Sequence, residues 1–302
     1  MELNQLKLLL NEFGENIKFE YNLKKKNWFN IGGKAKVYYK ANNLNELVIF
    51  LKKLDNKEDV FILGAGSNTL ISDNLFDGVV IKLGKNFNNI SLLGEDIIIA
   101  GSAVLDKSLS EFAMSNSLRG FEFLSCIPGT IGGGIRMNAG CFDNEFKDIL
   151  LSVQAIDKGG KVKTILSKDI KFEYRNNNLP DNLIFLSASF KGRKGDSIKI
   201  NNEMNRLKIE KEKNQPTKIK TSGSTFKNPI LQTQKKVWEL IKESVPLDTN
   251  FGDAYISDKH CNFFVNKGNA TFEDMINLIN FVSENVFKKT GIRLEKEIKI
   301  LE

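Results

Sequence analysis

Apolar residues recur along the chain in short patterns that predict a mixture of helices and strands. An opening helix is predicted where Leu3, Leu6, Leu10, Phe13 and Ile17 follow one another at three- and four-residue steps. Further helices are predicted at 105–117, from about 130, and at 194–220, 233–244 and 271–289. Strands are predicted at 60–63, 79–81, 97–99, 153–156, 161–165, 183–190, 262–265 and 293–301. The two kinds of element are mixed along the chain, which predicts an α+β fold.

The length and composition are those of a globular protein with a substantial core. The chain has 302 residues, of which 41% are hydrophobic, and this length suffices for two or three domains. No uncharged apolar run approaches the roughly 20 residues that span a bilayer. The N-terminal residues lack the compact apolar region of a signal peptide. We therefore expect a cytoplasmic protein that does not span a membrane.

Cysteine and charge patterns argue against several other classes. Cys126, Cys141 and Cys261 are far apart and form no C-x-x-C pair, so we expect reduced thiols and no metal site. The net charge of +7 comes from basic residues spread over the whole chain, which is typical of a solvated surface rather than of a nucleic-acid-binding stripe. Only six of the 44 basic residues are Arg. Where Lys is so dominant, an Arg such as Arg175 points to a planar donor for a carboxylate or phosphate.

A first glycine-rich segment, residues 64–69, directly follows a predicted apolar strand. Its glycines let the backbone turn sharply, so that successive N–H groups can surround a pyrophosphate. The segment lacks the third Gly of the common dinucleotide motif, and no Gly-Lys-Ser/Thr follows as in a Walker A loop. A Gly-rich hairpin turn is the alternative interpretation.

A second glycine-rich segment, residues 125–134, reads Ser-Cys-Ile-Pro-Gly-Thr-Ile-Gly-Gly-Gly. Pro-Gly-Thr would open a helix whose N–H groups and dipole attract phosphate. Three consecutive glycines cost a helix about 1 kcal/mol each relative to Ala, so we expect them to make room for a large ligand; a flexible loop is the alternative. Two such segments suggest a dinucleotide held between them, with Gly66 and Gly133 facing it.

These segments, with others further along the chain, resemble a known family. The others are residues 27–33 (Asn-Trp-Phe-Asn-Ile-Gly-Gly), 138–140 (Asn-Ala-Gly), 172–175 (Phe-Glu-Tyr-Arg), 223–229 (Gly-Ser-Thr-Phe-Lys-Asn-Pro), 260–263 (His-Cys-Asn-Phe) and 294–297 (Leu-Glu-Lys-Glu). Their order and spacing resemble the UDP-N-acetylenolpyruvoylglucosamine reductases, whose PCMH-type FAD-binding fold is shared with relatives of vanillyl-alcohol oxidase. That family uses FAD and NADPH to reduce an enolpyruvyl ether of UDP-N-acetylglucosamine to UDP-N-acetylmuramate for peptidoglycan.

The resemblance implies a two-part FAD-binding fold and a third, α+β substrate-binding domain. Residues 1–80, joined by a C-terminal strand in 292–302, would form the first FAD-binding subdomain, 81–195 the second, and 196–291 the substrate-binding domain. The implied cofactor is non-covalent FAD, the electron donor is NADPH, and the substrate is a UDP-sugar enolpyruvyl ether. We expect the shorter type II of the family, because 176–189 leaves no room for a long substrate-clamping insertion. We also expect a monomer.

The resemblance also assigns roles to individual residues. Arg175 would give two parallel donors to the substrate carboxylate, Ser224 would donate a proton to the neighbouring carbon, and Glu297, if protonated, would donate a further hydrogen bond. The implied cofactor-binding residues are Gly64, Ala65, Gly66, Ser67, Asn68, Thr69, Ser125, Pro128, Gly129, Thr130, Gly132, Gly133, Asn138 and Gly140. The implied substrate contacts are Tyr174, Lys227 and Asn228.

Three alternative functions compete with this one, and two of them belong to a different class. A flavin oxidase acting on an alcohol or sugar could use the same scaffold, but many of these tether FAD to a His near the pyrophosphate loops, and the only histidine, His260, lies far downstream. A non-catalytic flavin-binding module or a basic nucleic-acid binder would not account for Arg175, Ser224 and Glu297 in family order.

Some positions depart from the family pattern. Cys126 stands where the family usually has Gly, and Gly134 stands where Ala is common, so packing near the flavin is expected to differ. Residues 238–255 keep little of the usual Gly-rich pattern. His260 is either structural or a flavin contact.

Overall fold

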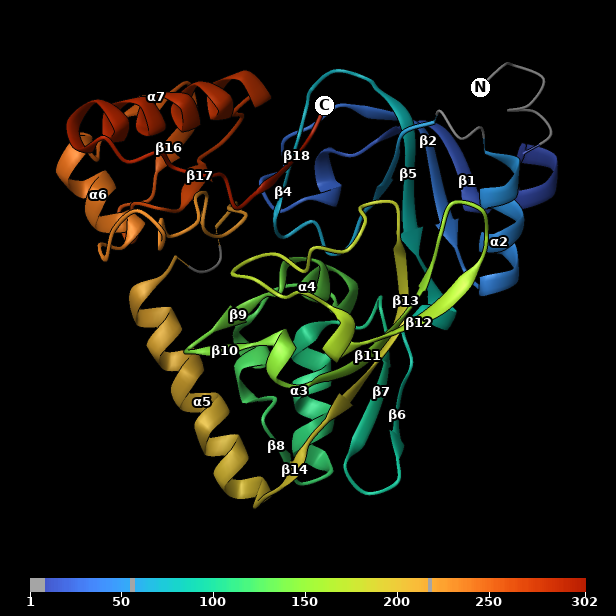
Figure 1. The fold of residues 1–302 in the computed structure, drawn as a ribbon. Helices are drawn as coiled ribbons and strands as arrows, with labels where there is room; N and C mark the ends of the chain where they lie inside the picture. Colours follow the sequence, from blue (N-terminus) through green and yellow to red (C-terminus); the bar gives the residue numbers. More distant parts are fainter. Residues whose placement is uncertain (1–8, 55–57, 217–218) are drawn as a thin grey trace. The chain divides into compact units, whose positions relative to one another are not determined.

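The fold is described for residues 9–54, 58–216 and 219–302 of a computed structural model (Figure 1). The chain divides into two compact units. The first comprises Met1–Phe19, Lys36–Ala65 and Asp77–Glu210, and the second comprises Glu20–Ala35, Gly66–Phe76 and Lys211–Glu302. Leu3 and Leu6 of the predicted opening helix lie outside the described residues.

A four-stranded sheet with the order β1-β2-β5-β3 forms early in the chain. Its strands are β1 (Ile17–Asn22), β2 (Lys34–Ala41), β3 (Val60–Ile62) and β5 (Phe76–Leu83). The helix α2 (Leu44–Lys53) follows β2 and begins at Asn43, whose side chain accepts a hydrogen bond from Glu46 N. Phe50 of α2 stacks on Tyr39 of β2 with ring centroids 3.9 Å apart. This contact joins the apolar face of the helix to the core of the sheet.

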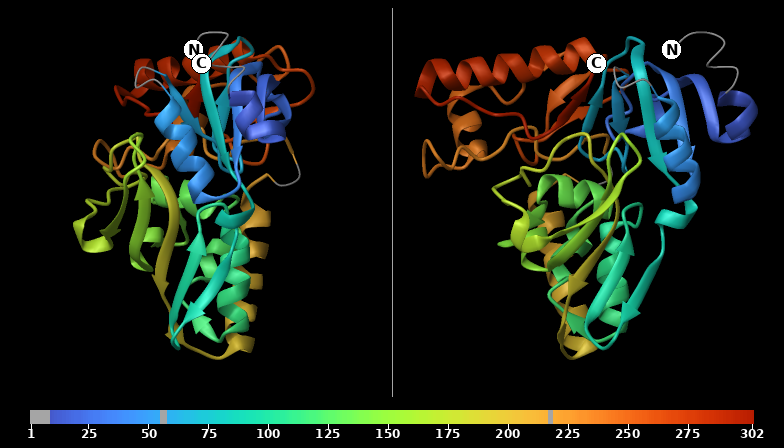
Figure 2. Two further views of the ribbon diagram at one scale, coloured as in Figure 1. Left: turned by 90° about the vertical axis from the view of Figure 1, so that its right-hand side faces the viewer. Right: turned by 45° about the vertical axis from the view of Figure 1, so that its right-hand side comes forward.

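A five-stranded antiparallel sheet with the order β12-β11-β13-β7-β6 forms the rest of the first unit's framework. Its strands are β6 (Ile90–Leu93), β7 (Ile97–Gly101), β11 (Leu150–Ile156), β12 (Val162–Leu166) and β13 (Ile184–Lys191). The helices α3 (Asp106–Ser115) and α4 (Ile131–Met137) lie on one face of this sheet (Figure 2). Leu109, Ile131 and Ile135 from these helices pack in one core with strand residues such as Ile98 and Val153.

Shorter elements complete the first unit. They are the strand pairs β8 (Leu118–Arg119) with β14 (Arg193–Lys194) and β9 (Gly140–Cys141) with β10 (Asn144–Glu145). The 3₁₀ turns of this unit are Gly14–Asn16, Lys85–Phe87, Glu122–Cys126, Phe146–Asp148 and Ser167–Asp169, and a further one, Lys24–Lys26, belongs to the second unit. The charged helix α5 (Ser197–Asn214) runs from the first unit into the second.

Besides the end of α5, the described residues of the second unit form two small sheets and two helices. The strand β4 (Thr69–Ile71) pairs in parallel with the C-terminal β18 (Lys299–Leu301), and β15 (Asn250–Phe251), β16 (Ala254–Ile256) and β17 (Phe264–Asn266) form an antiparallel sheet. The helices are α6 (Val237–Ser244) and α7 (Phe272–Thr290). α7 begins with a capping box between Thr271 and Asp274 and ends at Gly291, which adopts φ +72°.

Most predicted helices and strands are confirmed with errors at their ends, whereas some elements, such as β2 and α2, were not predicted. Ile17 begins β1 instead of continuing the opening helix, which the structure describes at 9–13. Of the predicted strand 293–301, only the last three residues form β18. The predicted strand 262–265 begins two residues later and ends one residue later, as β17. Within the described residues, no helix is both long enough and apolar enough to cross a membrane.

Candidate active site

The first glycine-rich segment connects two strands that lie in different sheets. β3 pairs with β5, whereas β4 pairs with β18, so the hairpin interpretation of residues 64–69 is wrong. Gly66 adopts φ +69°, a left-handed conformation that favours glycine. A Cβ at Gly66 would lie 2.2 Å from the carbonyl oxygen of Lys26. Gly66 is therefore required by its own backbone conformation and by the nearby carbonyl of Lys26, and its facing the cofactor stays a prediction.

The three glycines of the second segment lie in a helix, so the flexible-loop interpretation is wrong. A Cβ on Gly134 would lie 2.2 Å from the buried ring of Phe146, and a Cβ on Gly132 would lie 3.1 Å from Ser102 Cβ. A Cβ on Gly133 would meet only Thr130 Oγ1, at 3.6 Å. Gly134 and Gly132 are thus explained by packing, whereas Gly133 is exposed and leaves one side of the helix backbone uncovered.

The N-terminus of α4 is already satisfied by the protein's own backbone. Ile131 N donates to Val104 O at 2.9 Å, and Gly132 N donates to Ser102 O at 3.0 Å. The expectation that these first N–H groups are available to a phosphate is therefore wrong, because main-chain carbonyls take their place.

The two glycine-rich segments nevertheless lie against each other in the first unit. A Cβ at Gly64 would lie 2.7 Å from Thr130 Oγ1, and the same hydroxyl is the nearest group to Gly133. Lys82 Nζ donates a hydrogen bond to Gly64 O, which places a positive charge at the first segment. Small residues, a hydroxyl and an ammonium group thus meet at one place, and this set suits a phosphate-bearing ligand.

Asn68 and Thr69 continue into the second unit, where they contact the C-terminal segment and the 222 region. Asn68 Nδ2 donates to Glu297 O at 3.1 Å, and Lys299 N donates to Asn68 O at 2.9 Å. Ser222 Oγ donates to Thr69 O at 3.3 Å. These contacts fix the main chain beside Glu297.

Arg175 lies at the tip of a tight turn in the first unit. Glu173 N donates to Asn176 O at 2.9 Å, and Asn176 N donates back to Glu173 O at 3.2 Å. Arg175 itself has φ +57°, a conformation that a bulky residue adopts only when its surroundings hold it there. Its Nη2 donates to Gly140 O at 3.0 Å, and its guanidinium carbon lies 4.9 Å from the centre of the Tyr174 ring.

Ser224 and Glu297 are brought to neighbouring segments of the second unit. Ser224 forms an antiparallel bridge with Phe263. On the other side of the same segment, Glu297 N donates to Thr225 O at 2.8 Å, and an antiparallel bridge joins Phe226 to the residue before Glu297. Two of the three predicted catalytic residues are therefore on hydrogen-bonded neighbouring segments, although 72 residues separate them along the chain.

Asn262 holds the segment that carries Ser224. Its Oδ1 accepts from Phe226 N at 3.0 Å, and its Nδ2 donates to Phe226 O at 2.9 Å, while its carbonyl accepts from Thr225 N at 2.8 Å. Asn262 N donates to His260 Nδ1 at 3.3 Å. Burial lowers the pKa of His260, so this histidine is neutral near pH 7 and serves as an acceptor in the turn.

The implied substrate contacts of the second unit also have partners within the protein. Lys227 Nζ forms an ion pair with Glu295 Oε1 at 2.5 Å, and Asn228 Oδ1 accepts from Val237 N at the start of α6, at 3.0 Å. Both residues are half-buried.

One carboxyl of the first unit is buried without a hydrogen-bond partner among the described residues. Asp106 is fully buried at the start of α3, and neither of its carboxyl oxygens is hydrogen-bonded. A Cβ at Gly129 would lie 2.5 Å from Asp106 Oδ2, which explains the small residue between Pro128 and Thr130. Burial raises the pKa of the Asp106 carboxyl well above its usual value.

The arrangement in the first unit agrees with what known proteins show. Residues 35–166 match the family described as FAD binding domain, and the uncovered side of Gly133 and the ammonium of Lys82 fit such a dinucleotide. The chain is thus a flavoprotein of the FAD-binding class. Residues 215–301 match the C-terminal domain of UDP-N-acetylenolpyruvoylglucosamine reductase.

Relatives extend this match to the whole chain. The UDP-N-acetylenolpyruvoylglucosamine reductase of Pelagibacter ubique is 65% identical over 301 residues, covering 100% of both chains. That of Rickettsia canadensis is 44% identical and covers 93% of this chain and 94% of its own. The crystal structure of the Thermus caldophilus enzyme superposes with a TM-score of 0.81 at 28% identity, covering 95% and 98% of the two chains. The chain belongs to the UDP-N-acetylenolpyruvoylglucosamine reductase family, which favours the reductase over the oxidase alternative.

Several residues of the site have no signal in a single sequence. Lys82 is one lysine in an apolar strand, and Asn262 is one asparagine in a predicted strand. Their contacts join segments that are distant along the chain, so only the fold reveals them. Asp106 could have been noted as an acid at the start of a predicted helix, where acids are common for electrostatic reasons.

Proposed function

We propose that this protein reduces UDP-N-acetylenolpyruvoylglucosamine to UDP-N-acetylmuramate in the cytoplasm, with FAD as cofactor and NADPH as electron donor. The observation that carries the proposal is the pairing of the Ser224 and Glu297 segments in a chain of this family. The two glycine-rich segments would hold FAD, and its chemistry would be the transfer of a hydride from NADPH to the CH₂ carbon of the enolpyruvyl group.

Hydride addition pushes negative charge into the neighbouring carboxylate, and we assign the stabilisation of this charge to Arg175. A guanidinium presents two parallel N–H groups that match the two oxygens of a carboxylate. The turn at 173–176 holds Arg175 in an uncommon backbone conformation, so its orientation is determined before the substrate binds.

We assign the proton that completes the reduction to Ser224. A serine hydroxyl is a poor acid in water, so its contribution depends on placement next to the carbon that receives the proton. The paired segments at 262–263 and 295–297 flank residues 224–227 on both sides, which supports such placement. Glu297, on one of these segments, would donate a hydrogen bond to the developing charge when protonated.

We assign cofactor binding to the two glycine-rich segments and substrate binding to Tyr174, Lys227 and Asn228. Lys227 suits a diphosphate or a carboxylate, and an anion would compete with Glu295 for its ammonium group. Gly133 would allow the flat cofactor to lie against the backbone of α4.

The proposal is tested by following NADPH oxidation under anaerobic conditions with and without the enolpyruvyl substrate. We expect oxidation to depend on the substrate, with one UDP-N-acetylmuramate formed for each NADPH consumed. NADPH oxidation that needs oxygen and ignores the enolpyruvyl substrate would contradict the proposal and favour an oxidase.

A further inference from the structure

The turn that carries Arg175 is attached to the C-terminal end of α4 by side chains. Asn138 Nδ2 donates to Glu173 O at 3.1 Å, and Asn177 Nδ2 donates to Ile135 O at 3.0 Å. Asn138 and Asn177 are both buried. The position of Arg175 is therefore coupled to the same short helix that contains Gly133.

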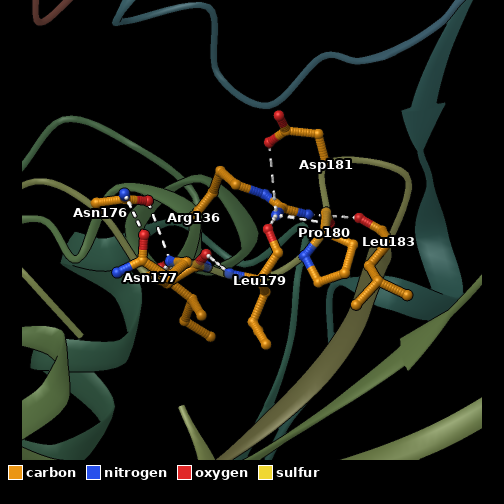
Figure 3. Close-up of polar contacts among 9 residues, drawn as sticks. Arg136, Asn176, Asn177, Leu179, Pro180, Asp181 and Leu183 are labelled. Atoms are coloured by element: carbon orange, nitrogen blue, oxygen red, sulfur yellow. Dashed lines mark hydrogen bonds and ion pairs between the residues drawn. The ribbon is translucent and has the colours of Figure 1, made fainter. Parts of the chain in front are cut away.

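Arg136 strengthens this attachment on the other side of the turn. Its guanidinium donates to the carbonyl oxygens of Leu179, Pro180 and Leu183 at 3.3, 3.1 and 2.6 Å (Figure 3). Asp181 Oδ1 lies 3.9 Å from Arg136 Nη1. The main chain after Arg175 is thus held to α4 over several residues.

Besides the Tyr174 ring, Gly140 and Glu145 lie next to the guanidinium of Arg175 and help to determine which way it faces. Its Nη2 donates to Gly140 O at 3.0 Å, and its Nη1 lies 4.0 Å from Glu145 Oε1. The side chains of Arg175 and Glu145 are 17% and 18% exposed, so water screens their charges less than it would on the surface. The 4.0 Å separation is too long for a hydrogen bond, so Glu145 acts on Arg175 through its charge.

Glu145 is itself held in place by contacts of its other carboxylate oxygen, Oε2. Glu145 Oε2 accepts from Asn138 Nδ2 at 3.0 Å and forms an ion pair with Lys147 Nζ at 2.7 Å. Asn138 Oδ1 accepts from Lys147 N at 3.1 Å. An asparagine amide has two N–H donors, and Asn138 gives one to Glu145 and one to Glu173. Both N–H donors of Asn138 are therefore engaged in hydrogen bonds within the protein.

We propose that Glu145 and Asn138 are positioning residues that orient the Arg175 guanidinium for the carboxylate of the substrate. Glu145 faces one edge of the guanidinium. Asn138 holds both Glu145 and the turn that carries Arg175, through its two N–H donors. A guanidinium held in this way meets the carboxylate without first losing the freedom of a long side chain. The inference rests on the proposed function, because it needs a substrate that carries a carboxylate.

The test compares Glu145→Gln with the matched control Asp181→Asn. Both changes remove one negative charge near an arginine, at 4.0 Å from Arg175 and at 3.9 Å from Arg136, but only Glu145 faces the Arg175 guanidinium, whereas Asp181 is fully exposed beside Arg136. For each holoenzyme, calorimetry measures the affinity for UDP-N-acetylmuramate, which has a carboxylate, and for UDP-N-acetylglucosamine, which lacks one. Stopped-flow absorbance measures flavin reduction by NADPH and flavin reoxidation by the enolpyruvyl substrate.

For Glu145→Gln we expect at least tenfold weaker binding of UDP-N-acetylmuramate and at least tenfold slower reoxidation by the enolpyruvyl substrate. Binding of UDP-N-acetylglucosamine and flavin reduction by NADPH should stay within twofold of the parent. Asp181→Asn should stay within twofold in all four measurements. Glu145→Asp keeps the charge on a shorter side chain and provides a second variant, with a smaller loss in the same two measurements.

Equal weakening of both ligands by Glu145→Gln, or no change in either, would overturn the inference. Failure of the proposed function gives a different result. In that case the parent enzyme itself would not prefer UDP-N-acetylmuramate over UDP-N-acetylglucosamine, and its reduced flavin would not be reoxidised by the enolpyruvyl substrate.

Discussion

Replacing Gly133 with Ala is expected to stabilise the apoprotein while weakening its affinity for FAD. The added Cβ would have only Thr130 Oγ1 nearby, at 3.6 Å, which is an ordinary contact. Ala is favoured over Gly inside a helix by about 1 kcal/mol. For domains of this size, 1 kcal/mol corresponds to roughly 2–4 °C in Tm, so the apoprotein should melt about 2 °C higher.

Gly134→Ala provides the control, because it lies one residue further along the same helix. Its Cβ would lie 2.2 Å from Phe146 Cε2, and the Phe146 ring is fully buried. Overpacking of this kind costs about 1–3 kcal/mol, which exceeds the gain in helix propensity. We therefore expect a lower Tm for Gly134→Ala and a higher Tm for Gly133→Ala.

Although Gly133→Ala is expected to stabilise the apoprotein, it is expected to weaken the binding of FAD. If FAD lies against the uncovered backbone of α4, the new methyl group must push it away. We therefore expect the Kd of FAD to rise at least tenfold, which corresponds to a loss of about 1.4 kcal/mol in binding free energy. The assay is thermal unfolding of the apoproteins together with fluorescence titration of FAD. A lower apoprotein Tm for Gly133→Ala, or an FAD affinity equal to that of the parent, would refute the reasoning.

Three further predictions concern the attachment of the flavin, Ser224 and Asp106. Acid or heat should release all of the flavin as FAD, because residues 64–69 and 125–140 contain no His; flavin that stays on the denatured chain would contradict this. Ser224→Ala should leave flavin reduction by NADPH near the parent rate and slow reduction of the enolpyruvyl group by about 10²-fold; equal slowing of both steps in stopped-flow would make Ser224 structural. Burial raises the pKa of Asp106 in the folded state above the unfolded value of about 3.9. The free energy of unfolding therefore decreases as pH rises above about 4, because the unfolded chain gives up this proton more readily than the folded protein does. Asp106→Asn should therefore raise Tm more at pH 8 than at pH 4, and an equal change at both pH values would count against this account.

Local patterns were sufficient to predict many elements of the fold. Thr271 and Asp274 mark the start of α7 in the sequence as clearly as in the structure, because capping is a local interaction. The end of the first helix was harder to predict. Ile17 continues the helical spacing but begins β1, since pairing with β2 outweighs a periodicity that extends over only a few turns.

The purpose of each glycine could not be predicted from sequence. Gly132, Gly133 and Gly134 are identical letters in one run, but Ser102 and Phe146 explain two of them, and only Gly133 leaves the helix uncovered. Gly66, expected to face the cofactor, is required by the carbonyl of Lys26. These neighbours come from distant parts of the chain, and a local pattern contains no information about them.

The roles of Arg175, Ser224 and Glu297 were predicted from their order along the chain, but their surroundings were not. The sequence contains no sign that Glu297 N bonds to Thr225 O or that Asn262 holds the Ser224 segment. Such pairings depend on strands meeting across the second unit. Secondary structure can be predicted without them, whereas the geometry of a site cannot.

A single-turnover experiment tests the central claim most directly. The purified protein is reduced anaerobically with one equivalent of NADPH and is then mixed with UDP-N-acetylenolpyruvoylglucosamine while the visible absorbance of the flavin is followed. The account predicts that the flavin is reoxidised without oxygen and that one UDP-N-acetylmuramate appears for each flavin. A flavin that stays reduced until oxygen is admitted, with no UDP-N-acetylmuramate formed, would contradict it.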